Sequence, residues 1–230
     1  MISPYDWQEG IAQRAQYTEN RLRGGSPIVG MSLDCGVLLY TYRRHVRKVY
    51  EVYDRLMFAA MGQQADVENM RLTAVDFAHS EGFARSEADV TIGRVVGFAL
   101  SNPMKRAFGD ISSAPYVIYA LFAEMHDKPA DDLFFRLRYD GDFENQHGVA
   151  VAAGTDDAEK RMCAWLDSGF KHNLSLEKAI ELADEVWRIG ADVDGNGEPD
   201  ANLLADSRPE AGLLDRNSPH ERKFRLISSK

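Results

Sequence analysis

Hydrophobic and polar positions alternate along several short stretches of the chain, which is the pattern of β-strands with one buried face. Two of these stretches meet at the turn 32–36 and predict a hairpin. The stretch 56–61 is apolar at every position, so we expect that strand to be covered on both faces. The predicted strands are 25–31, 36–42, 48–53, 56–61, 116–125, 133–139, 148–153, 212–215 and 223–227.

Other stretches repeat their apolar positions every three or four residues, which predicts helices. The first of them has only a narrow apolar stripe, so it needs support from another surface, such as that of a neighbouring subunit. Asn102-Pro103 is expected to end the third helix, because proline disrupts a helix interior. The predicted helices are 5–22, 64–83, 90–102, 155–170 and 175–190, and a polar loop follows over 191–209.

The order of these elements is one helix, four strands, two helices, three strands, two helices and two strands. Paired helices between blocks of antiparallel strands predict an α+β protein with two sheets face to face and helices outside. At 230 residues and 44% hydrophobic content, the chain can bury a substantial core. We expect residues 25–230 to form a single domain, preceded by an N-terminal segment and helix over 1–24.

The composition and net charge of the chain disfavour some classes of binding partner. A net charge of −9 argues against non-specific binding to nucleic acid or to an anionic membrane. No run of 18 apolar residues and no secretion signal is visible, and the two cysteines are too few for a disulfide framework. These features favour a cytoplasmic protein, and nothing in the sequence calls for a cofactor.

The first hairpin begins with Gly25-Ser26, and a serine at this place has a chemical use. If the chain were cut between these two residues, Ser26 would gain an α-amine beside its hydroxyl. Such an amine can act as the general base for an N-terminal nucleophile. The alternative interpretation is an ordinary serine at the start of a strand, after a glycine pair that ends a helix.

The element order and the residues of the hairpin together resemble the proteasome family of N-terminal-nucleophile proteins. A helix before the Gly-Ser strand resembles α-type rather than β-type subunits. The strand 48–52 and the small-residue strand end 59–62 also resemble α-type subunits. The stretches 51–62, EVYDRLMFAAMG, and 214–226, LDRNSPHERKFRL, are similar to bacterial α subunits in particular, as is Ile2-Ser3-Pro4. The resemblance covers nearly the whole chain and implies a four-layer α-β-β-α sandwich. It also implies a non-catalytic subunit of a heptameric ring that gates substrate entry for protein degradation.

The resemblance also allows a test of catalysis. The catalytic β-type pattern has a threonine nucleophile supported by a lysine and a carboxylate, and the residues at those places here are Ser26, Lys48 and Tyr42. A tyrosine cannot replace the carboxylate that would balance Lys48, so the resemblance favours a structural subunit. A self-processing hydrolase that uses Ser26 with Lys48 is the alternative, and a ring-forming homologue without a β partner is a third possibility.

In α-type subunits the lysine equivalent to Lys48 lies in a pocket between neighbouring subunits, where it binds the C-terminal carboxylate of a ring-shaped ATPase or other activator. The resemblance places Gly25 and Gly62 on the wall of that pocket, and Gln16 where relatives often carry an acidic residue. The adjoining basic run 43–48 would either steer acidic tails to this face or form a solvated loop. The implied partners are a proteasome β subunit, neighbouring α subunits and the activator tail.

Two further features of the sequence suggest a gate and a metal loop. Tyr5-Asp6, with Tyr17, resembles the N-terminal residues of α subunits that close or order the axial gate. Asp192, Asp194 and Asn196 occupy alternate positions typical of a calcium loop, but Leu203 stands where that loop needs a glutamate. A surface linker without a bound metal is therefore the favoured interpretation of residues 191–209.

Overall fold

The computed structural model describes residues 4–227, and ten strands within that range form two antiparallel five-stranded sheets. Sheet A has the order β10-β9-β2-β1-β8 and is built from β1 (Ile28–Leu33), β2 (Gly36–Arg43), β8 (Val149–Ala152), β9 (Arg208–Asp215) and β10 (Phe224–Ile227). Sheet B has the order β3-β4-β5-β6-β7 and is built from β3 (Val49–Tyr53), β4 (Leu56–Gly62), β5 (Ile118–Glu124), β6 (Leu133–Leu137) and β7 (Phe143–Gln146).

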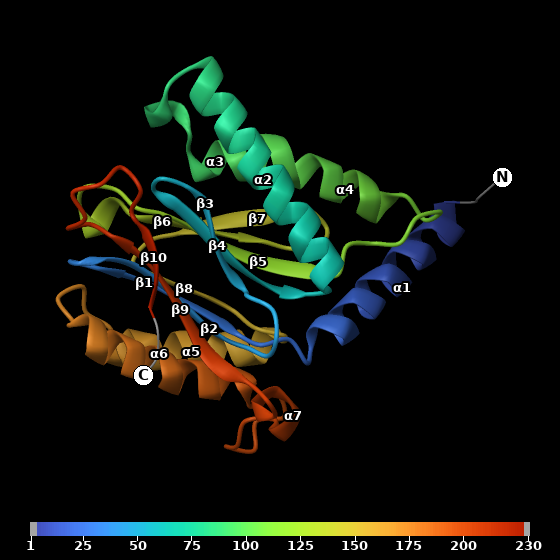
Figure 1. Cartoon of the computed structure of the whole chain (residues 1–230). Helices are drawn as coiled ribbons and strands as arrows, with labels where there is room; N and C mark the ends of the chain where they lie inside the picture. The colour runs from blue at the N-terminus through green and yellow to red at the C-terminus, as the bar shows by residue number, and fades with distance from the viewer. Residues whose placement is uncertain (1–3, 228–230) are drawn as a thin grey trace.

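Helices cover the outer face of each sheet, so the chain forms four layers (Figure 1). The helices α2 (Gln64–Ala84), α3 (Ile92–Arg94) and α4 (Ser101–Gly109) lie over sheet B, and α5 (Asp156–Gly169) and α6 (Leu176–Ala191) lie over sheet A. The predicted α+β sandwich with an α-β-β-α order is confirmed. The remaining helical elements are α1 (Pro4–Leu22), α7 (Ala201–Leu204), the 3₁₀ turns Glu87–Asp89 and Pro129–Asp131, and a π-helical segment, Val95–Leu100.

Burial on both faces of the central strands explains their apolar sequences. In β4, Met57, Ala59 and Met61 belong to the cluster between the two sheets, whereas Phe58 and Ala60 pack toward the α2 layer. The strand is therefore covered above and below, as its uninterrupted apolar run predicts. Three hydrophobic clusters result: one between the sheets and one under each helical layer.

The helix expected over 90–102 continues past Pro103 to Gly109, so the prediction of its end was wrong. The turn before the proline is π-helical, and the Ser101 N–H reaches back five residues to the carbonyl of Val96. A π-turn shifts the local hydrogen-bond pattern, which lets the helix accommodate a ring that would otherwise collide with the preceding turn.

Two elements escaped the sequence patterns. The strand β7 was not predicted because three of its four residues are exposed and carry no apolar alternation. The loop expected over 191–209 contains α7, and β9 begins inside it at Arg208, where Tyr42 and Arg43 of β2 supply the pairing partners. Both elements depend on contacts that are distant in sequence.

A buried ion pair ties together the end of the sandwich that carries the β1–β2 turn. Asp132, which is fully buried, accepts hydrogen bonds from Arg216 Nη2 and from Ser32 Oγ, both at 2.6 Å, and from the His126 N–H at 2.7 Å. Arg216 also donates to the carbonyls of Leu33 and His126. This cluster joins the loop before β6 to the loop after β9.

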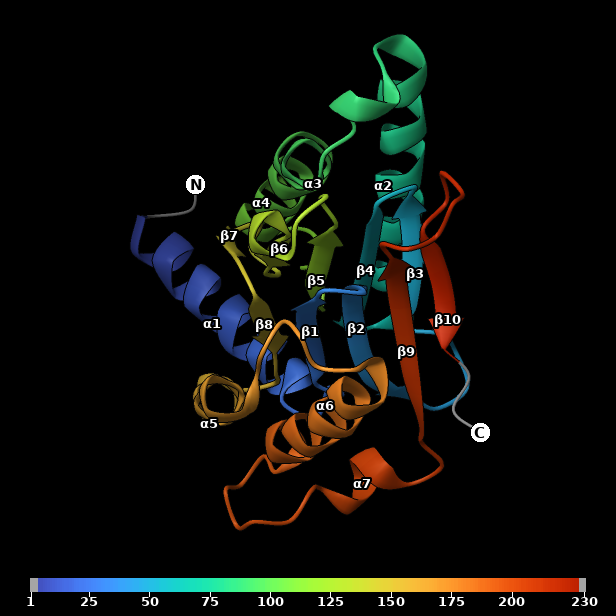
Figure 2. The same ribbon diagram turned by 90° about the vertical axis from the view of Figure 1, so that its left-hand side faces the viewer.

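The first helix, α1, lies on the side of the sandwich away from β3 and β10 (Figure 2). Arg14 attaches it by donating to the carbonyls of Ala107, Phe108 and Ser113, and Leu22 enters the cluster between the sheets. The narrow apolar stripe of α1 is thus supported by its own chain. No helix in residues 4–227 is long and apolar enough to cross a bilayer.

Candidate functional site

Ser26 lies between α1 and β1 and is almost completely buried. Its Oγ donates to the Tyr42 carbonyl at 2.9 Å and accepts from Trp187 Nε1 at 3.1 Å and from the Tyr42 N–H at 3.3 Å. The Thr41 hydroxyl lies 3.1 Å away. The single proton and the lone pairs of Ser26 are therefore all engaged, and the hydroxyl joins β2 to α6.

Tyr42, which the resemblance aligns with the carboxylate of the catalytic pattern, faces α6. Its ring stacks on that of Trp187 at 3.9 Å, and its hydroxyl donates to Asp184 Oδ1 at 2.7 Å. Burial raises the pKa of Tyr42, and the Asp184 carboxylate raises it further, so the phenol stays neutral. The structure brings Ser26 and Tyr42 together, but it shows no hydrogen bond between Ser26 and Lys48 in the described residues.

Lys48 lies just before β3, and its side chain is half-buried. Its N–H donates to Glu210 Oε2 at 2.7 Å, and its carbonyl accepts from the Ala60 N–H at 3.3 Å. Within residues 4–227 its ammonium has neither a hydrogen bond nor an ion pair. Burial, with repulsion from Arg44, lowers the pKa of Lys48 to about 8, although attraction to Glu210 opposes the fall.

Glu210 is the residue of this site that sequence reasoning missed. It lies on β9 opposite Thr41, and only 6% of it is exposed. One oxygen accepts from the Lys48 N–H, and the other lies 3.5 Å from Arg43 Nε. Burial raises the pKa of Glu210, while the N–H groups of Lys48 and Val49 and the Arg43 charge oppose the rise.

Gly25 packs against Met61, the residue before Gly62 at the end of β4. A methyl group on Gly25 would lie 2.7 Å from Met61 Sδ, so the close packing there admits no larger residue. Gly62 follows Met61 with φ +130°, a backbone conformation that favours glycine, and is exposed. The Lys48 carbonyl bonds to Ala60 in the same strand, so these three predicted pocket residues gather around residues 60–62.

The other predicted residues lie on α1. Gln16 and Tyr17 are exposed there, and Asp6 is exposed near its start. The side chain of Tyr5 lies outside the described residues, as do Ile2 and Ser3. No hydrogen bond or ion pair connects Gln16 to Lys48 in the described part of the chain.

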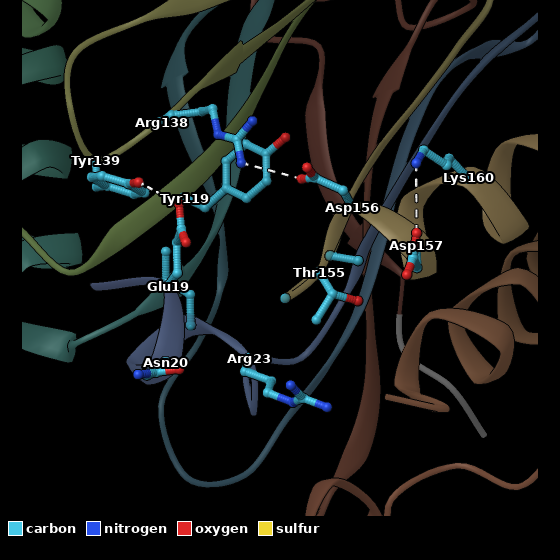
Figure 3. A pocket seen from close by; sticks show the side chains of 13 residues that line it. Glu19, Asn20, Arg23, Tyr119, Arg138, Tyr139, Thr155, Asp156, Asp157 and Lys160 are labelled. Carbon is cyan, nitrogen blue, oxygen red and sulfur yellow. Dashed lines mark hydrogen bonds and ion pairs between the residues drawn. The ribbon is translucent and has the colours of Figure 1, made fainter. Parts of the chain in front are cut away.

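A cavity of about 430 Å³ lies between the end of α1 and the start of α5 (Figure 3). The charged side chains on its wall are largely matched within the chain. Arg138 lies 3.4 Å from Asp156, and Lys160 lies 3.5 Å from Asp157. Lys48 does not line this cavity, so the cavity is separate from the surroundings of Lys48.

The calcium-like stretch uses its oxygens to build a loop. The Asp192 carboxylate accepts from the N–H groups of Asn196 at 3.0 Å and Gly197 at 2.9 Å. The Asn196 side-chain oxygen accepts from the Glu198 N–H, and Asp194 forms an ion pair with Arg23 at 3.2 Å. Residues 4–227 contain no group of three or more His, Cys, Asp and Glu side chains placed to hold a metal ion.

Comparison with known proteins agrees with this architecture. A protein-family model described as "Proteasome subunit" matches residues 23–202. The chain belongs to the proteasome subunit family. Its similarity to curated members of the family extends over nearly its whole length. It is 30% identical over 233 residues to "Proteasome subunit alpha" of Xylanimonas cellulosilytica, covering 98% of this chain and 90% of that one. The protein of the same name from Streptomyces coelicolor is 28% identical over 228 residues, covering 98% and 85%.

The match to α subunits agrees with a helix that precedes the Gly-Ser strand, since α1 occupies residues 4–22 here. The family prediction made from the sequence is therefore confirmed.

Proposed function

We propose that this chain is a non-catalytic α-ring subunit of a bacterial-type 20S proteasome in the cytoplasm, where it controls substrate entry and docks a regulatory ATPase. It would assemble with copies of itself in a heptameric ring and with a β subunit that supplies the peptidase activity. The relatives named as α subunits and the helix before Ser26 support the ring assignment.

The observation that carries the docking function is the half-buried ammonium of Lys48. No carboxylate of the described residues lies within ion-pair distance of it, although Glu210 is close enough to bind the Lys48 backbone. A cation in a partly desolvated place gains most from an ionised partner brought by another molecule. A chain terminus is such a partner, and the exposed Gly62 leaves space for its backbone to approach.

The gating function rests on α1. Its attachment through Arg14 fixes the helix to the end of α4 and to the loop that follows it, so the first residues of the chain are joined to a helix that is anchored to the rest of the fold. We therefore propose that Tyr5, Asp6 and Tyr17 contribute to the gate. Removal of residues 1–7 is expected to raise the degradation of an unfolded substrate by the assembled complex, and an unchanged rate would contradict this assignment.

A self-processing hydrolase is less well supported. Ser26 is saturated with hydrogen bonds and contacts a neutral tyrosine where a carboxylate would be needed. Intact-mass measurement of the purified protein separates the two functions, because self-processing would remove residues 1–25.

The docking function can be tested with Lys48→Ala in the assembled α-β complex. Stimulation of peptide hydrolysis by the ATPase should be lost, while the complex still assembles and hydrolyses small peptides unaided. Lys48→Arg keeps the charge and should retain part of the stimulation. The matched control is Lys178→Ala, which removes a lysine from α6 and should leave the stimulation unchanged. Full stimulation of Lys48→Ala would refute the docking site.

A further inference from the structure

A single buried carboxylate joins the two sheets where Lys48 lies. Glu210 comes from β9 of sheet A, and the Lys48 N–H that it accepts belongs to the chain entering β3 of sheet B. The two strands lie side by side (Figure 2). A buried carboxylate is costly unless it is hydrogen-bonded and paired, and Glu210 has both kinds of partner.

The partners of Glu210 lie at both ends of one loop. Arg43 ends β2, and its Nε lies 3.5 Å from Glu210 Oε1, whereas Lys48 ends the β2–β3 loop and donates its N–H to Oε2. The carboxylate therefore holds the two ends of the loop together. Because the Lys48 backbone is fixed in this way, its side chain leaves the sheet from a defined position.

The same carboxylate is the only acidic group among those that act on the Lys48 ammonium within the described residues. Arg44 repels the ammonium, and Glu210 attracts it. Glu210 in turn interacts with Arg43 and Arg47. Without Glu210, Lys48 would stand half-buried beside three guanidinium groups, those of Arg43, Arg44 and Arg47.

We propose that Glu210 is a positioning residue of the docking site, which fixes the backbone at Lys48 and keeps its ammonium charged against the neighbouring arginines. The inference rests on the docking function proposed for Lys48. It assigns a role to a residue 162 positions away in the chain, on a different sheet. Glu210 does not itself touch the docked tail.

A pH profile separates this role from a general contribution to folding. Removal of the Glu210 charge lowers the Lys48 pKa, so binding of a carboxylate should be lost at a lower pH. Removal of the Arg43 charge should act in the opposite direction, because one cation disappears and the carboxylate is released toward Lys48. A purely structural role would weaken binding without moving the profile in either direction.

The experiment uses the assembled α-β complex and a fluorescein-labelled peptide of the last eight residues of the cognate ATPase, with the C-terminal amide as the negative probe. Affinity is measured by fluorescence polarisation between about pH 6 and pH 9, where the Lys48 ammonium titrates. In parallel, competitive acetylation with mass spectrometry gives the pKa of Lys48 without any peptide. The test variants are Glu210→Gln and Arg43→Gln. The control is Glu51→Gln on β3, which also loses an ion pair, the one with Arg222.

Glu210→Gln is expected to bind about twofold more weakly at pH 8, about threefold more weakly at pH 9 and nearly normally at pH 6.5, because a fall of half a pKa unit has that effect. Arg43→Gln should shift the profile to higher pH, and Glu51→Gln should leave it in place. Profiles of Glu210→Gln and Arg43→Gln that coincide with that of the unmodified complex would overturn the inference. If Glu210→Gln fails to assemble, the Arg43→Gln shift and the acetylation data still decide. Normal binding by Lys48→Ala would instead defeat the docking function itself.

Discussion

Replacing Asp132 with alanine tests how strongly the far end of the sandwich depends on its buried ion pair. Asp132 is fully buried and accepts from Arg216, Ser32 and the His126 N–H at 2.6–2.7 Å. Alanine would leave the Arg216 guanidinium, whose side chain is only 13% exposed, without its counter-ion. Removal of one partner of a buried pair costs about 3–5 kcal/mol, so we expect a loss of about 4 kcal/mol. That is a large share of the roughly 5–15 kcal/mol that stabilises a typical protein.

Urea denaturation gives the free energy of unfolding, and one fixed protein concentration for all variants keeps the concentration dependence of assembly from entering the comparison. Asp157→Ala is the control, because its pair with Lys160 is exposed and should contribute less than about 1 kcal/mol. The double variant Asp132→Ala with Arg216→Met should be more stable than Asp132→Ala alone, since no unpaired charge stays buried. The reasoning is refuted if Asp132→Ala costs no more than Asp157→Ala.

Three other outcomes are expected. Gly62→Ala should lower the free energy of unfolding by about 2 kcal/mol, because the new methyl group would collide with the Val117 carbonyl and the backbone has φ +130°. In the same urea titration Gly24→Ala should be nearly neutral, since a methyl group there has no neighbour within 4 Å. Ser26→Ala should cost about 1–3 kcal/mol by leaving a buried indole N–H without its acceptor, with peptidase activity of the α-β complex unchanged in a fluorogenic assay. The affinity for the ATPase tail peptide should be constant below pH 7 and fall about tenfold per pH unit well above pH 8, since the peptide carboxylate needs the protonated form of Lys48. Equal affinity at pH 7 and pH 9 would contradict the role of Lys48 as the binding cation.

Local pattern predicted the central strands because both of their faces are buried, as the apolar run of β4 illustrates. It failed where a segment is shaped by a distant partner. The strand β7 is polar and exposed, and it forms because β6 offers a complementary edge. The start of β9 contains a proline and two charged residues, and it forms because β2 pairs with it. The predicted helix end at Pro103 was wrong because the π-helical turn before the proline lets the helix accommodate its ring.

The residues of the candidate site likewise fall into those that the sequence indicated and one that depends on a distant contact. Resemblance to known subunits drew attention to Lys48, Gly25 and Gly62, and the structure brings all three to the end of β4. Glu210 gave no signal, because it lies between the predicted loop 191–209 and the predicted strand 212–215 and reaches Lys48 only when the two sheets pack together. A group whose role depends on the contact between two sheets cannot be found from the periodicity of either one.

The hydrogen bonds of Ser26 bear on how the fold can evolve. In a catalytic relative the hydroxyl at this place must be available to attack a substrate. Here Trp187 occupies it as a donor, and the same indole ring stacks on Tyr42 and fills the space under α6. Recovery of a nucleophile would require more than cleavage before Ser26. The indole would have to give up its acceptor, and a carboxylate would have to replace a tyrosine that holds α6 in place. Each of these steps alone is expected to lower stability, so packing around Trp187 as well as the missing carboxylate stands between Ser26 and a nucleophile.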